Sequence, residues 1–187
     1  MDKGQTLIIV IIIIILIIAG IALALRNSLQ NSQTPPPQTS GTTADLSNQN
    51  LVSIPSYVLS NTSLTVLNLS HNNLASLPSQ IGNLVNLEQL YVNNNMLSGA
   101  LPGEIRKMSK LQILDASNNM LTGIPAEIGQ LSNLTTLNFA NNNINTMPNE
   151  IANIKNNLKT FDLSGNEFTA AQITELRQQL PNTLIIY

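Results

Sequence analysis

The sequence predicts an α/β solenoid, in which parallel strands form a concave sheet, preceded by one N-terminal transmembrane helix. Three observations predict this architecture. A pattern with a period of 23–24 residues occurs six times, leucines alternate with polar residues within each copy, and an uncharged apolar run precedes the copies. A fixed period of this length is the signature of a repeat architecture, in which each copy packs on its neighbours.

The apolar run covers residues 7–25, LIIVIIIIILIIAGIALAL, and follows a short flank at residues 1–6. At about 1.5 Å per residue a helix of this length spans roughly 28 Å, close to the thickness of a bilayer core. We therefore expect a retained transmembrane helix. Removal as a secretory signal stays an alternative, because Ala22-Leu23-Ala24 has the small-x-small pattern that precedes a cleavage site.

A second processing alternative lies nearer the N-terminus. Residues 3–8, KGQTLI, resemble the class III signal of prepilins, in which a peptidase cuts after a glycine that follows a basic residue. The resemblance implies cleavage after Gly4 with the apolar helix retained. Ile9 stands where pilins carry a glutamate that aids assembly, which argues against pilus assembly more than against cleavage.

Residues 26–41 form a polar segment with three consecutive prolines. Such a segment cannot bury enough apolar surface to fold, so it is expected to be a linker. The amino terminus and Lys3, offset by Asp2, lie on one side of the apolar run, and only Arg26 lies close on the other. The positive-inside bias then favours a cytoplasmic N-terminus and an extracytoplasmic repeat domain at residues 42–187.

The copies have a common internal pattern. A degenerate copy at 42–63 precedes five fuller copies, at 64–86, 87–110, 111–133, 134–157 and 158–180. In each, an L-x-L pair predicts a short strand with its leucines inward and the intervening residues outward. Strands stacked about 4.8 Å apart form a parallel sheet.

The full pattern, L-x-x-L-x-L-x-x-N-x-L, resembles that of leucine-rich repeat proteins over residues 42–187. The resemblance implies a horseshoe whose concave face binds a partner. The asparagine recurs at the turn after each strand, where a buried amide can donate to and accept from backbone groups. We expect a structural ladder of Asn72, Asn95, Asn119, Asn142 and Asn166, with Gln49 in the degenerate copy.

The second half of each fuller copy predicts a short convex helix or 3₁₀ turn. Proline suits its start, a glutamate in the first turn complements the helix dipole, and an isoleucine closes the core. These residues are Pro78, Pro102, Pro125 and Pro148; Glu104, Glu127 and Glu150; and Ile81, Ile105, Ile128 and Ile151. The last copy instead carries an amphipathic segment, TAAQITELRQQL, and residues 184–187 predict a closing strand.

Composition excludes several function classes. A formal net charge of −2 offers no basic patch for nucleic acid, and the absence of cysteine excludes disulfides and thiolate metal sites. The single histidine, His71, is expected on the outward flank of a strand without a catalytic partner. Asp45, Asp115 and Asp162 share one column but lie two or three copies apart. We therefore predict no enzyme, cofactor or metal, and a monomeric repeat domain.

The expected concave positions are mostly small and uncharged. Val66, Tyr91 and Ile113 stand out on three successive strands, surrounded by His71, Glu88, Gln89 and Asp115. Apolar and aromatic side chains within a polar field have the composition of a binding hot spot. The sequence thus predicts a membrane-tethered module that recognises a protein, peptide or glycan. The alternative is a structural or pilin-like assembly component of the cell envelope.

Overall fold

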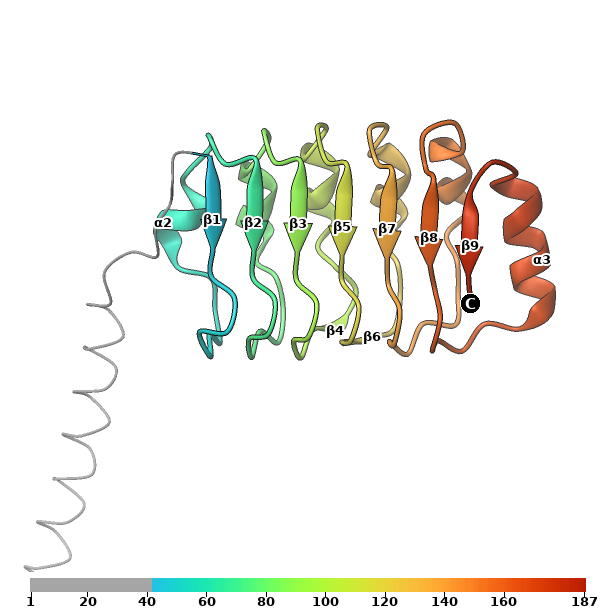
Figure 1. Ribbon diagram of the computed structural model, residues 1–187, viewed down its shortest axis with the longest axis horizontal. Helices are drawn as coiled ribbons and strands as arrows, with labels where there is room; N and C mark the ends of the chain where they lie inside the picture. The colour runs from blue at the N-terminus through green and yellow to red at the C-terminus, as the bar shows by residue number, and fades with distance from the viewer. Residues whose placement is uncertain (1–41) are drawn as a thin grey trace, which may run out of the picture. The chain divides into compact units, whose positions relative to one another are not determined.

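The computed structural model describes residues 42–187 (Figure 1). The predicted flank, transmembrane helix and linker, at residues 1–6, 7–25 and 26–41, lie outside the described residues, as do the cleavage positions at Gly4 and Ala24. Among residues 42–187 there is no helix long and apolar enough to cross a membrane.

A seven-stranded parallel sheet runs the length of the described chain, with one strand from each turn of the solenoid (Figure 1). Its order follows the sequence, because each turn of the chain packs on the preceding one. The strands are β1 (Thr43–Asp45), β2 (Val66–Asn68), β3 (Gln89–Tyr91), β5 (Ile113–Asp115), β7 (Thr136–Asn138), β8 (Thr160–Asp162) and β9 (Leu184–Ile186). The predicted parallel solenoid is confirmed, and so is the closing strand, since β9 pairs with β8.

The other side of each turn carries a short helix. These helices are α2 (Ser56–Leu59), the 3₁₀ helices η1 (Ser79–Asn83), η2 (Gly103–Lys107), η3 (Ala126–Gln130) and η4 (Asn149–Ile154), and α3 (Ala170–Gln179). Each 3₁₀ helix directly follows its predicted proline, which takes the N-cap position with an extended backbone. The predicted glutamates lie in the first turns. The four predicted isoleucines are fully buried, so this assignment is confirmed.

The core consists of apolar residues stacked in register between the strands and the helices. The middle residue of every strand is buried, from Ala44 at one end to Ile185 at the other. Ala44 is fully buried although it belongs to the terminal copy, because it pairs with Leu67 and both side chains point inward.

The asparagine ladder is present, and it joins each turn to the one before. Asn119, for example, donates from Nδ2 to the carbonyls of Val92 and Ala116, at 3.1 Å each. Its Oδ1 accepts from the N–H of Leu97 in the preceding turn, at 3.0 Å. Asn72, Asn95, Asn142 and Asn166 make equivalent bonds.

The residue before each ladder position has a left-handed backbone, which the sequence did not predict. Asn94, Asn118 and Asn141 have φ of 55°, 53° and 54°, and Gly165 has φ of 69°. Asparagine tolerates this conformation better than most residues with a side chain. The frequent Asn-Asn pairs therefore have two separate roles, since the first residue makes the turn and the second forms the ladder.

Two further features link neighbouring turns. A small parallel sheet pairs β4 (Ser98–Gly99) with β6 (Met120–Leu121), on the stretch of chain that leads from the strands to the 3₁₀ helices. On the opposite stretch, Asn86 and Asn133 donate to the carbonyls of Thr62 and Ser109, at 2.9 and 2.7 Å. At the C-terminal end, α3 starts with a capping box.

Candidate functional site

The outward side of the seven-stranded sheet presents two rows of side chains, and we call this side the sheet face. The first row contains Thr43, Val66, Gln89, Ile113, Thr136, Thr160 and Leu184. The second row contains Asp45, Asn68, Tyr91, Asp115, Asn138, Asp162 and Ile186. Adjacent members of a row lie on hydrogen-bonded strands, about 4.8 Å apart.

Most polar side chains of the second row hold the backbone that follows the strand. Asp115 Oδ1 accepts from both the N–H and the hydroxyl of Ser117, at 3.0 and 2.7 Å. Asn68 makes the same two bonds to Ser70, and Asp162 makes them to Ser164. The second oxygen of Asp115 has no hydrogen-bond partner within residues 42–187, so it remains available on the sheet face.

Tyr91 interrupts the second row, because its side chain bonds to a residue of its own strand and not to the backbone that follows the strand. Its hydroxyl donates to Oε1 of Gln89 on the same strand, at 3.0 Å, so the ring lies back toward the first row. Gln89 is paired in register with Val66 on one side and Ile113 on the other. The structure therefore gathers Val66, Gln89, Tyr91 and Ile113, which we call the Tyr91 patch, with Asp115 directly beside Tyr91.

His71 and Glu88 lie apart from these rows. His71 occupies the left-handed turn after β2, with φ of 57°, and its side chain is exposed. Its expected position on a strand flank is therefore wrong, because the chain has already turned at that residue. Its Nε2 lies 3.4 Å from Nδ2 of Asn94, in the equivalent turn of the next copy. Glu88 precedes β3 and is outside both outward rows.

The titratable groups of the sheet face are too dispersed for paired acid–base chemistry. Asp45, Asp115 and Asp162 are separated by three and two strand spacings, or roughly 14 and 10 Å. Within residues 42–187 no group of three or more histidine, aspartate or glutamate side chains could hold a metal ion. Burial raises the pKa of the Tyr57 hydroxyl, but Tyr57 lies on α2, in the helical layer.

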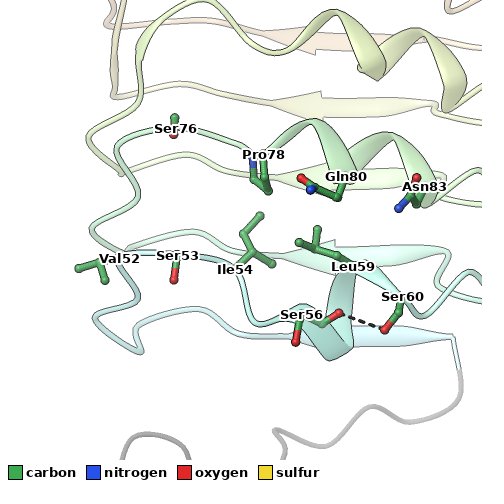
Figure 2. Close-up of a pocket in the computed structure, with 10 residues that line it drawn as sticks. All are labelled: Val52, Ser53, Ile54, Ser56, Leu59, Ser60, Ser76, Pro78, Gln80 and Asn83. Carbon is green, nitrogen blue, oxygen red and sulfur yellow. Dashed lines mark hydrogen bonds between the residues drawn. The ribbon is translucent and has the colours of Figure 1, made fainter. Parts of the chain in front are cut away.

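A groove of about 460 Å³ lies in the helical layer, between α2 and η1 (Figure 2). It is lined by Val52, Ser53, Ile54, Ser56, Leu59, Ser60, Ser76, Pro78, Gln80 and Asn83. Leu59 occupies the repeat position held by Gly82 and Gly129 in later copies, where neighbouring helices pack closely. Its side chain points into the space between the two turns (Figure 2). None of the predicted site residues lines this groove.

The arrangement described above is that of a solenoid with one leucine-lined strand per turn and an asparagine ladder between turns. A sequence profile described as leucine rich repeats (two copies) matches residues 62–102 and 109–153. The chain belongs to the leucine-rich repeat family. Domains of this family commonly mediate protein–protein recognition, and the fold is typically a scaffold for binding rather than for catalysis.

Solved structures of this family superpose on most of the chain. A leucine-rich repeat protein of Leptospira interrogans is 34% identical, with a TM-score of 0.75 over 78% of this chain and 37% of that protein. The Arabidopsis thaliana receptor kinase ectodomain GASSHO1/SCHENGEN3 is 36% identical, with a TM-score of 0.65 over 77% of this chain but 18% of its own. The ectodomain of the receptor kinase SOBIR1, also from Arabidopsis thaliana, is 30% identical, with a TM-score of 0.59 over 78% of this chain and 74% of its own.

No curated protein matches the sequence. The chain spans well under half of the Leptospira protein and about a fifth of the GASSHO1/SCHENGEN3 ectodomain. The similarity therefore covers the repeat solenoid of this chain and only part of the length of those two proteins.

Proposed function

We propose that this protein is a membrane-tethered, non-enzymatic recognition module that binds a protein, peptide or glycan through the sheet face. The Tyr91 patch is the observation that carries this proposal. It places one aromatic and two aliphatic side chains on adjacent strands, within a field of threonine, asparagine and serine. The four side chains of the patch are partly buried, so their neighbours on the sheet restrict them. The hydrogen bond between Tyr91 and Gln89 also holds these two side chains in place.

Such a patch suits binding for physical reasons. A tyrosine ring offers a large apolar area, and the hydrogen bond to Gln89 reduces the conformational entropy that it would lose on binding. Interface hot spots are enriched in tyrosine and surrounded by polar residues that exclude water. The GASSHO1/SCHENGEN3 ectodomain was solved in complex with Casparian strip integrity factor 2, so a related solenoid binds another protein factor.

Replacing Tyr91 with alanine is expected to weaken partner binding by at least about 1–2 kcal/mol, because the ring is the largest side chain of the patch. Thr136→Ala, in the first row on the strand next to Ile113 and two strands from Tyr91, should leave affinity almost unchanged. Titration of a partner captured from the native envelope by the full chain would measure both. An affinity that ignores Tyr91 but falls with changes at Glu104 or Arg106 would place the site on the helical layer.

We also propose that residues 7–25 anchor the protein as a single membrane-spanning helix and that the repeat domain is extracytoplasmic. The support is the uncharged run of nineteen apolar or small residues followed by a polar linker. The full chain should stay in the membrane pellet under alkaline extraction, whereas a variant lacking residues 1–40 should be soluble and folded. Full-length protein in the soluble fraction would contradict this proposal.

A pilin-like assembly role is the second candidate, and only residues 3–8 favour it. Mass spectra of the native protein distinguish the two roles. Trimming after Gly4 together with recovery in filaments would support assembly, while an intact N-terminus would remove the sequence basis for it.

A further inference from the structure

The charged residues of the sheet face all have the same sign. Its two outward rows contain three carboxylates, at Asp45, Asp115 and Asp162, and neither a lysine nor an arginine. The rest of the described chain carries both signs, for example in the pair Arg106–Glu127 on the helical layer. The charges that a partner meets on these two rows are therefore all negative, which favours positive charge on the partner.

One carboxylate of the three lies beside the Tyr91 patch. Asp115 is paired in register with Tyr91, and Ile113, two residues earlier on β5, is paired with Gln89. Asp115 Oδ1 is held by Ser117, while Oδ2 has no partner among residues 42–187. The ring of Tyr91 is held toward the first row by Gln89. An aromatic ring, an aliphatic side chain and a carboxylate oxygen thus lie on neighbouring positions of two adjacent strands.

We propose that this subsite receives an arginine or lysine side chain of a protein or peptide partner. The methylene stem packs on Tyr91 and Ile113, and the cationic head binds Oδ2 of Asp115. Long basic side chains combine an apolar stem with a charged end, and they bind well over tyrosine rings. A charge-assisted hydrogen bond to the carboxylate adds affinity and direction. This inference rests on the proposed function and specifies the chemistry of the partner at that site.

Selection from a library of random peptides displayed on phage, with the full chain immobilised, tests this inference. The expected result is enrichment of peptides that carry arginine or lysine next to an apolar residue. Binding of a selected peptide should weaken as salt is raised, because the ion pair lies on a partly exposed surface. Enrichment of acidic or neutral peptides at the Tyr91 patch would overturn the inference.

Two aspartate variants make a matched pair. Asp115→Asn should weaken a selected peptide about tenfold, which is the effect of removing one charge-assisted bond. It should still fold, because Asn68 makes the same bonds to Ser70 that Asp115 makes to Ser117. Asp162→Asn removes the same charge from the same row two strands away, and should weaken the peptide less than about twofold. Equal effects of both variants would overturn the subsite.

Tyr91→Leu separates this inference from the proposed function. Leucine keeps an apolar contact but removes the aromatic face, so the preference for basic peptides should fall while apolar binding remains. If selected peptides bind equally well to Tyr91→Ala and to the unaltered chain, recognition by the patch itself fails. If peptides depend on Tyr91 but show no preference for basic residues, only the subsite fails.

Discussion

Asn119→Ala is expected to lower the free energy of unfolding by about 2–4 kcal/mol, because it leaves a buried donor without a partner. Asn119 Oδ1 is the acceptor for the N–H of Leu97, a residue that is only 1% exposed. The carbonyls of Val92 and Ala116 lose one bond each but keep another, from Asn95 and Asn142. The unpaired N–H of Leu97 therefore dominates the expected loss.

Gln49→Ala is the matched control at the same repeat position of the first copy. The Gln49 side chain is exposed and makes no hydrogen bond within residues 42–187, and only its backbone N–H reaches Asn72. Its replacement should change the free energy of unfolding by less than about 0.5 kcal/mol. Thermal unfolding of the full chain measures both variants. Equal losses would contradict the view that interior ladder residues hold the turns together.

The fold was predictable because each recurring residue satisfies one local requirement that every turn repeats. The alternating leucines have to face the core, a proline can precede each 3₁₀ helix, and Ile105 or Ile128 has to close the space behind the sheet. None of these requirements depends on which copy is considered. Period and alternation alone therefore predicted the seven parallel strands and their register.

Features that depend on contacts between particular copies were not predictable in this way. The β4–β6 sheet needs the backbones of two neighbouring turns to approach, and its strands have no alternating pattern of their own. The groove lies beside Leu59, which stands where two of the later copies have glycine, at Gly82 and Gly129. That departure from the repeat was visible in the sequence, but its consequence required the packing of α2 on η1.

The candidate site was predictable only in part. The period placed Val66, Tyr91 and Ile113 on neighbouring strands, as found. Sequence could not show that Asp115 is anchored by Ser117 or that Tyr91 leans toward Gln89, since both depend on side-chain conformation. The strand pattern placed His71 on a strand flank, whereas β2 ends at Asn68 and His71 already lies in a left-handed turn.

Gly129→Ala is expected to destabilise the protein by about 2–3 kcal/mol, because the new methyl group overpacks a close contact between backbones. A Cβ at residue 129 would lie 2.1 Å from the carbonyl oxygen of Glu150 and 2.8 Å from its Cβ. Gly129 belongs to η3 and Glu150 to η4, so relief requires a shift of one 3₁₀ helix against the next. The strands of the same turns, held by the ladder, resist that shift.

Gly123→Ala is the control for the change in backbone entropy. Alanine restricts the unfolded chain at both positions, which alone would stabilise the protein by about 0.4–1 kcal/mol. At residue 123 a Cβ meets no heavy atom within 4 Å, so this variant should be neutral or slightly more stable. The difference between the two variants in thermal or denaturant unfolding then reports the contact with Glu150. Equal stabilities would mean that the 3₁₀ helices can separate freely, and that Gly129 does not set the close spacing of η3 and η4.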